Sequence, residues 1–184
     1  MVCYVLVFGS LMLVCGKMGD LVGHCLIFRT GLVVTAVGCV ACAIAPDWPL
    51  FLLARTVQGV GTALTLACTP ALATAVYPPE QRVKALAGYA MSMSLAATVG
   101  PFLGGILVDM WGWQAVFWVR VPIALLALTL SGALPSSHTQ SRHFDSLGAI
   151  LLAASIGMLL LALVLSQRPT ASGWMPLSLL VVGF

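Results

Sequence analysis

Six hydrophobic runs, each about as long as a bilayer is thick, occupy most of this chain and constrain its fold more than any other feature. A helix needs about 20 apolar residues to cross the hydrocarbon core of a membrane. In lipid the backbone polar groups must hydrogen-bond within their own segment, so such runs form helices. We predict spans at residues 2–16, 27–45, 50–74, 85–108, 114–134 and 146–166, with a seventh beginning at 177. The predicted fold is an all-α, polytopic transmembrane helical bundle.

The composition excludes a water-soluble domain. Hydrophobic residues make up 61% of the 184 residues and charged residues only 7%, whereas a soluble domain carries about 25% charged residues. We therefore predict that the apolar side chains of this protein face a lipid bilayer, which is its expected partner. The net charge of +3 is too thinly spread to indicate nucleic-acid binding, so no nucleic-acid partner is predicted.

The hydrophobic runs at the two ends of the chain are shorter than a complete membrane span. The first run covers about 15 residues, which is short for a bilayer, and the seventh run stops at Phe184. We expect both ends to be cut. A signal peptide is the alternative for the first run, but such a peptide begins with basic residues, and none precedes Lys17.

The basic residues predict how the spans are oriented, because short cytoplasmic loops carry an excess of Lys and Arg. Alternate loops place Lys17, Arg29, Arg82, Lys84 and Arg142 on one side and Arg168 on the other. We therefore predict a multi-pass protein of the cytoplasmic (inner) membrane with the first side inside the cell. Two further arginines, Arg55 and Arg120, lie inside spans near the outer side and weaken the asymmetry.

A polar segment with spaced glycines joins the first two predicted spans. Gly16, Asp20 and Gly23 set its G-x3-D-x2-G spacing. The segment resembles the cytoplasmic loop signature of the major facilitator superfamily. The resemblance implies a transport-gating loop whose Asp20 caps a helix N-terminus, where a carboxylate is favoured, and pairs with basic groups across the bundle. The family's basic positions hold Leu21, His24 and Cys25 here, and an ordinary polar loop is the alternative.

The third span carries an arginine well inside a hydrophobic run. Arg55, Gln58 and Gly59 form the pattern R-x-x-Q-G. An arginine in a membrane helix is costly and normally faces a partner or a wet cavity, which marks a functional position. Its polar stripe continues at helical spacing through Thr62, Thr65 and Thr69. The pattern resembles one associated with proton coupling in the same superfamily, and the alternative is an arginine that reaches back to the outer interface.

Small residues recur every four positions along the fourth span, at Gly88, Ser92, Ala96, Gly100 and Gly104. Such a ladder lets helix backbones approach closely, so we expect this face at a helix–helix contact. Pro101 removes a backbone donor, so a bend is expected there. The run resembles the antiporter signature of the superfamily, which is carried here by Ala96, Gly100, Pro101, Gly104 and Gly105. Generic close packing of membrane helices is the alternative.

Three further stretches narrow the resemblance to one branch. Gly112-Trp113, Val121-Pro122 and the segment 144–148 are similar to the fourteen-helix drug:proton antiporters of this superfamily. The resemblance implies that the spans correspond to the second to eighth helices. Residues 1–134 would then be an N-terminal six-helix bundle without its first helix. Residues 135–184 would be a cytoplasmic linker, one further span and the start of the next.

The resemblance implies a secondary carrier that exports small lipophilic, cationic compounds, powered by the proton gradient and needing no cofactor. The alternative is a truncated, non-transporting membrane fragment or an accessory membrane subunit. Proton exchange usually needs an acidic side chain or a histidine inside the bundle. All the acidic residues lie in loops or at span ends, at Asp20, Asp47, Glu80, Asp109 and Asp145.

Enzymatic and metal-dependent functions find little support in the sequence. Cys39 and Cys42 have C-x-x-C spacing but lie inside a hydrophobic run, without the βαβ context of a redox motif. The histidines His24, His138 and His143 are too scattered for a metal site. We therefore predict neither an enzyme nor a metal centre.

Overall fold

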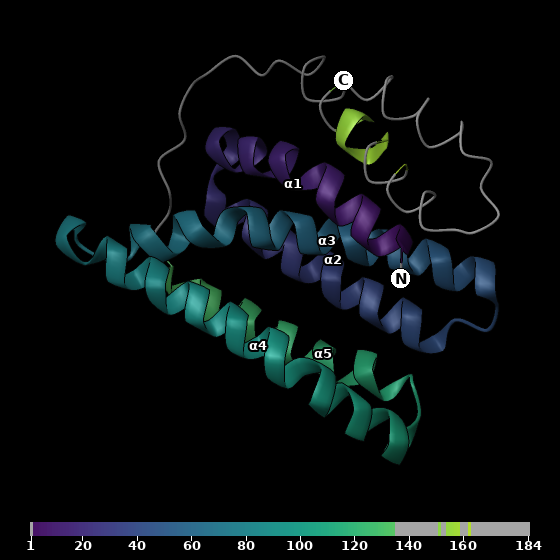
Figure 1. Ribbon diagram of the computed structural model, residues 1–184. Helices are drawn as coiled ribbons and strands as arrows, with labels where there is room; N and C mark the ends of the chain where they lie inside the picture. Colours follow the sequence, from purple (N-terminus) through teal and green to yellow (C-terminus); the bar gives the residue numbers. More distant parts are fainter. Residues whose placement is uncertain (1, 135–150, 152–153, 159–161, 163–184) are drawn as a thin grey trace.

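The chain folds into a bundle of long helices (Figure 1). The computed structural model describes residues 2–134, 151, 154–158 and 162. Its helices are α1 (Val2–Val22), α2 (His24–Ile44), α3 (Trp48–Ala75), α4 (Arg82–Trp111) and α5 (Ala115–Leu130), with short 3-10 turns η1 (Pro79–Gln81) and η2 (Ser131–Ala133). Within these described residues there is no strand, and the predicted all-α fold is confirmed.

Some predictions fall on other parts of the chain. The predicted linker at 135–145 and the run from 177 lie outside the described residues. Of the predicted span at 146–166, the structure describes only 151, 154–158 and 162, all of which are helical.

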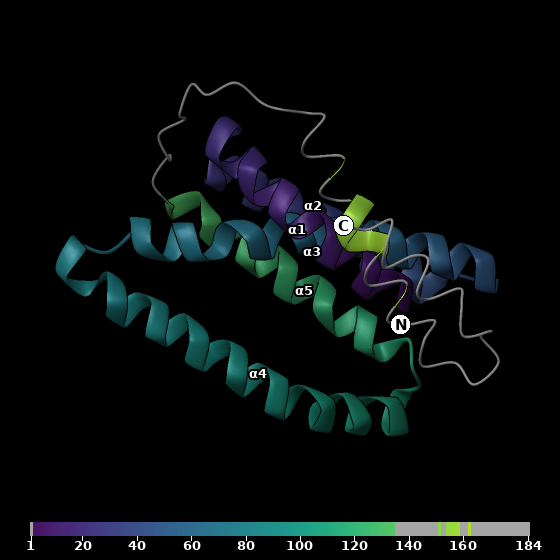
Figure 2. The same cartoon turned by 45° about the horizontal axis from the view of Figure 1, so that its top comes forward.

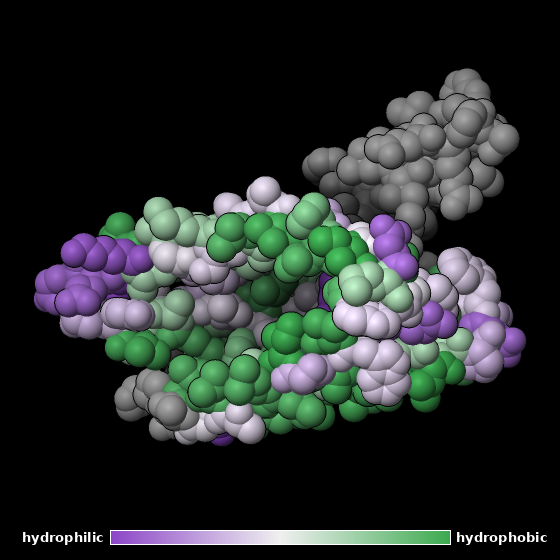
Figure 3. Space-filling model, turned by 90° about the horizontal axis from the view of Figure 1, so that it is seen from below, coloured by the Kyte–Doolittle hydropathy of each residue, from purple (hydrophilic) through white to green (hydrophobic). Residues whose placement is uncertain are grey.

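Three helical segments of the described chain are long and apolar enough to cross a membrane, namely His24–Ile44, Trp48–Ala75 and Pro79–Trp111. The fifth helix, Ala115–Leu130, is apolar but shorter than the predicted span at 114–134, because the chain tightens into η2 at Ser131. Figure 3 shows hydrophobic side chains covering the middle of the visible face, while hydrophilic side chains gather toward its ends. This distribution suits helices whose middles face lipid and whose ends face water.

The centre of the bundle is a close crossing of α2 and α3. A Cβ atom added to Gly38 of α2 would lie 2.8 Å from the Cα and the backbone N of Gln58 on α3. One added to Gly61 of α3 would lie 2.5 Å from the backbone N of Thr35 on α2. Real Cβ atoms do not approach backbone atoms this closely, so the crossing requires glycine at both positions. Small residues serve the same purpose at membrane helix interfaces in general.

Two other helices pack around this crossing. A Cβ on Gly59 would meet the backbone O of Tyr4 in α1 at 3.2 Å, so α1 lies close against α3. The fifth helix, α5, packs against α2. There the Arg29 guanidinium donates to the Ser131 carbonyl O at 2.6 Å and to its Oγ at 3.2 Å. These bonds join α2 to the C-terminal end of α5, where the same Ser131 carbonyl also accepts the backbone N–H of Leu134 at 3.1 Å.

The fourth helix is held differently. It lies along the outer flank of the bundle (Figure 1 and Figure 2), and none of its residues, all of which the structure describes, is buried. It continues as one helix through Pro101 and ends at Gly112, whose φ of 82° suits glycine. The fourth helix is therefore joined to its neighbours without contributing to the core.

One predicted boundary is wrong. The sequence predicted a span that ends at residue 16 and then a loop, but α1 continues as helix to Val22. Only Gly23, with a φ of 109°, separates it from α2, which begins at His24. Hydropathy detects the lipid-embedded part of a helix, whereas polar residues such as Lys17 and Asp20 prolong the helix into the interface.

Candidate functional site

The Arg55 side chain lies among aromatic rings contributed by three helices. Its guanidinium carbon is 4.5 Å from the ring centre of Phe117 on α5, 5.2 Å from that of Phe51 on α3, and 5.9 Å from that of Tyr4 on α1. The electron-rich faces of such rings attract a cation, and each contact contributes about 0.5–2 kcal/mol depending on its desolvation. The arginine therefore points into the bundle at the place where α1, α3 and α5 meet.

The Gln58 amide connects this cation to two cysteines. Gln58 is only 1% exposed, and its Oε1 accepts a hydrogen bond from the Arg55 guanidinium at 3.1 Å. Its Nε2 donates to the Cys39 Sγ at 3.2 Å, and the Cys42 Sγ lies 4.0 Å from the same Oε1. Both ends of the amide are thus engaged, as a buried polar group requires. The R-x-x-Q pattern works here because residues three apart share one helix face.

Arg55 has no carboxylate beside it in the part of the chain that the structure describes. No acidic side chain of that part lies within ion-pair distance of it, and its Nε is buried without a hydrogen-bond partner there. Aromatic faces and one amide oxygen offset only part of the cost of placing a cation among apolar groups. The site therefore retains the capacity to attract an anionic group.

The polar stripe that the sequence predicted along α3 forms hydrogen bonds to other helices along only part of its length. The Tyr4 hydroxyl donates to the Thr62 Oγ1 at 3.2 Å, and Thr62 donates onward to the Gln58 carbonyl at 2.9 Å. Thr65 and Thr69 instead donate to carbonyls of their own helix, at 2.9 Å and 2.7 Å. Only Arg55, Gln58 and Thr62 thus belong to a hydrogen-bond network that connects helices.

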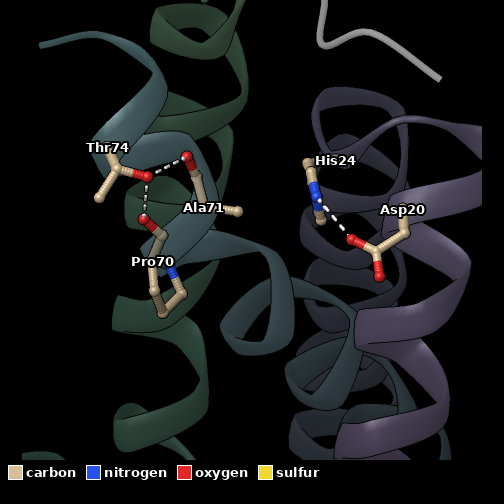
Figure 4. Close-up of polar contacts among 5 residues, drawn as sticks. All are labelled: Asp20, His24, Pro70, Ala71 and Thr74. Atoms are coloured by element: carbon tan, nitrogen blue, oxygen red, sulfur yellow. Dashed lines mark hydrogen bonds and ion pairs between the residues drawn. The ribbon is translucent and has the colours of Figure 1, made fainter. Parts of the chain in front are cut away.

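The predicted gating residues lie at the junction of α1 and α2. The Asp20 Oδ1 is 3.2 Å from the His24 Nε2, an ion pair when the histidine is protonated (Figure 4). The expectation that Asp20 caps a helix is wrong, because it lies in the last turn of α1, and the residue before α2 is Gly23. Gly16 also lies inside α1. A gating role for these three residues stays a prediction.

The same close-up also shows a hydroxyl of α3 that is occupied within its own helix (Figure 4). Thr74 donates to the carbonyls of Pro70 and Ala71, at 3.2 Å and 2.9 Å (Figure 4). The Nδ1 of His24 is buried without a partner among the described residues. Among the described residues, the ion pair of Asp20 and His24 therefore lies within the α1–α2 junction.

The antiporter-signature residues are placed contrary to expectation. A Cβ added to Gly88, Gly100, Gly104 or Gly105 would meet nothing within 4 Å, and Ala96 and Pro101 are exposed. The expected helix–helix contact on this face is therefore absent from the described part of the chain. A ladder of small residues permits close approach but does not itself attract a partner.

Several residues of the site were not predicted as members of it. Tyr4, Phe51 and Phe117 surround the arginine, and Cys39 bonds to Gln58. Phe51 precedes Arg55 by four residues, and that helical spacing was a usable signal. The rings on α1 and α5 depend on how the helices are rotated, which no local pattern shows.

Comparison with known proteins places this chain in a family. The sequence profile described as "Major Facilitator Superfamily" matches residues 1–184. The chain belongs to this superfamily. Its members are integral membrane transporters rather than enzymes, and the membership predicted from the three signatures is confirmed.

Relatives within the superfamily carry names that refer to drug resistance. The chain is 33% identical over 150 residues to "Multidrug resistance protein Stp" of Mycobacterium tuberculosis (strain CDC 1551 / Oshkosh), covering 80% of this chain and 28% of that protein. It is 34% identical over 173 residues to "Methylenomycin A resistance protein" of Bacillus subtilis (strain 168), covering 93% and 36%.

A further relative bears a name that mentions no substrate. This is "Uncharacterized MFS-type transporter Rv1250" of Mycobacterium tuberculosis (strain ATCC 25618 / H37Rv), 35% identical over 174 residues, which cover 94% of this chain and 30% of that protein. The chain thus spans about a third of the length of the curated relatives it matches. The division of this major facilitator chain at residue 134 stays a prediction.

Proposed function

We propose that this chain is part of a drug:proton antiporter that exports small lipophilic, cationic compounds across the cytoplasmic membrane. The observation that carries the proposal is the Arg55 guanidinium, held among three aromatic rings and by Gln58 inside a helix long enough to span a membrane. Relatives named for resistance to many drugs and to methylenomycin A support export of drugs.

The physical role proposed for Arg55 is to control a proton. A guanidinium within about 4–6 Å of a carboxylate favours the charged form and lowers the pKa of that acid. A carboxylate that approaches Arg55 in one state of the carrier and leaves it in another would release and rebind a proton. Carriers of this kind rock two halves about a site near the middle of the membrane, and that motion supplies the two states.

The test is efflux of ethidium from cells that express the intact carrier containing these residues. Arg55→Lys keeps the charge but loses the planar fork of donors that reaches Gln58 and the rings. We expect its efflux rate to fall at least about tenfold, while the amount of protein in the membrane is unchanged. Arg82→Lys, at an exposed position, is the matched control and retains the wild-type rate. Unchanged efflux in Arg55→Lys would refute the role of Arg55.

A second candidate is an accessory membrane subunit that moves no substrate itself. It is favoured by the placement of the acidic residues, since those that the structure describes are all exposed near helix ends, at Asp20, Asp47, Glu80 and Asp109. Ethidium efflux that rises above the level of cells without the protein, and that collapses when an ionophore removes the pH gradient, excludes this candidate.

A further inference from the structure

The buried Gln58 amide is satisfied in only one of its two orientations. Its carbonyl oxygen accepts hydrogen bonds, whereas its NH2 group donates them. The Arg55 guanidinium is a donor without any acceptor, and it donates to the Gln58 Oε1 at 3.1 Å. Turning the amide over would place donor against donor around a side chain that is only 1% exposed. The oxygen must therefore face Arg55, and the nitrogen must face away from it.

The nitrogen of this amide is met by a thiol of α2. The Gln58 Nε2 donates to the Sγ of Cys39, a fully buried residue, at 3.2 Å. Sulfur is a weak acceptor, but among the described residues Cys39 is the hydrogen-bond partner of this NH2 group. The Cys42 Sγ lies on the same helix, 4.0 Å from the Gln58 Oε1, to which its S–H group donates. The two thiols thus meet opposite ends of the amide in opposite roles.

The base of the same side chain is also held by α2. A Cβ added to Gly38 would lie 2.8 Å from the Gln58 Cα and 2.9 Å from the Gln58 Cβ. The backbone of α2 therefore lies against the base of this side chain, while Cys39 and Cys42 engage its tip. One helix thus determines both where the Gln58 side chain starts and how its amide is turned.

We propose that Cys39 is a positioning residue for Arg55: by accepting the Gln58 N–H, it holds the amide oxygen toward the guanidinium. The inference rests on the role proposed for Arg55 in transport. The three aromatic rings attract the charge of Arg55, but Gln58 is its hydrogen-bond acceptor among the described residues. Without the Cys39 thiol, a buried NH2 group loses its partner, which costs more than the bond itself contributes. Turning or moving the amide relieves that cost but withdraws the oxygen from Arg55.

The first experiment tests the hydrogen bond without transport, by unfolding the full chain in mixed detergent and SDS. We expect Cys39→Ala to raise the unfolding equilibrium constant about tenfold, because it leaves a buried donor unpaired. In the Gln58→Leu background the same change should have at least about threefold less effect, because the donor is no longer there. Circular dichroism follows the loss of helix. Equal effects of Cys39→Ala in the two backgrounds would overturn the proposal.

The second experiment measures ethidium efflux from cells that express the intact carrier containing these residues, at equal amounts of protein in the membrane. Cys39→Ala should lower the rate about three- to tenfold. Cys39→Ser should retain at least about half of the rate, because its hydroxyl still accepts the N–H. The control is Cys68→Ala, which removes an equally buried thiol outside this network and keeps the wild-type rate. Equal losses in Cys39→Ala and Cys39→Ser would overturn the proposal.

A double variant distinguishes positioning from a merely structural role. If Cys39 acts through Arg55, Cys39→Ala should change the rate that remains in Arg55→Lys by less than about twofold. The full three- to tenfold loss in that background would overturn the proposal. If Cys39→Ala keeps the wild-type rate while Arg55→Lys loses it, the positioning role is wrong and the proposed function stands. If Arg55→Lys itself keeps the wild-type rate, the proposed role of Arg55 fails and the inference fails with it.

Discussion

Helices α2 and α4 both present small residues at regular spacing, yet within the described residues only α2 uses them for contact. Gly38 of α2 lies against the backbone of α3 so closely that an added Cβ would be 2.8 Å from Gln58. On α4 an added Cβ at Gly100 or Gly104 would meet no atom of the described residues within 4 Å. A ladder of small residues therefore marks a face capable of close approach, while the partner is decided elsewhere in the fold.

The largest predicted effect compares glycines on these two helices. Gly38→Ala places a methyl group against backbone atoms that cannot rotate away, so we expect a loss of about 2–3 kcal/mol in the free energy of unfolding. The methyl group of Gly104→Ala meets no atom of residues 2–134 within 4 Å and the substitution gains helix propensity, so it should be neutral or stabilising by up to about 1 kcal/mol. Unfolding in mixed detergent and SDS, followed by circular dichroism, measures both. Equal losses of unfolding free energy in the two variants would show that the two helix faces are packed alike.

A smaller effect tests which contact holds α5 against α2. Arg29→Met removes the hydrogen bonds that the guanidinium donates to Ser131 at the end of α5. We expect a loss of about 1–2 kcal/mol in the same unfolding measurement, because hydrogen bonds from a charged donor contribute more than neutral ones. The matched variant Arg82→Met, at the exposed start of α4, should change the stability by less than about 0.5 kcal/mol. If both variants unfold alike, the Arg29 contact contributes nothing.

The smallest effect concerns the junction of α1 and α2. Asp20→Asn removes the partner of His24, but the aspartate side chain is 52% exposed. Water screens such a pair, so we expect a change in stability below about 0.5 kcal/mol. A loss of more than about 1.5 kcal/mol in the SDS titration would show that the pair is a structural latch rather than an exposed contact.

Much of the fold follows from hydropathy, and the differences have physical reasons. The runs at 27–45, 50–74 and 85–108 coincide closely with α2, α3 and α4. The first boundary was misplaced because Lys17 and Asp20 stay helical at the membrane surface, where lipid no longer selects apolar residues. The close crossing of α2 and α3 was also not predicted, although Gly31 and Gly38 place small residues along α2, as the ladder does along α4.

The candidate site was predictable along one helix and not between helices. Arg55 and Gln58 share a face of α3 by their spacing, and the structure shows their hydrogen bond. The aromatic surroundings depend on Tyr4 and Phe117, which come from helices whose rotation is decided by packing. Sequence periodicity gives the face of one helix but not the angle at which another helix meets it. The functional roles of these residues remain predictions.

The most direct test of the proposed function is substrate-dependent proton movement in proteoliposomes. The intact carrier containing these residues is reconstituted with the pH dye pyranine inside, and tetraphenylphosphonium is added under an imposed pH gradient. We predict a proton flux that depends on the added cation and falls at least about tenfold in Arg55→Lys, with the protein reconstituted to the same level. A cation-dependent flux of wild-type size in Arg55→Lys, or no such flux in the wild type, would contradict the proposal.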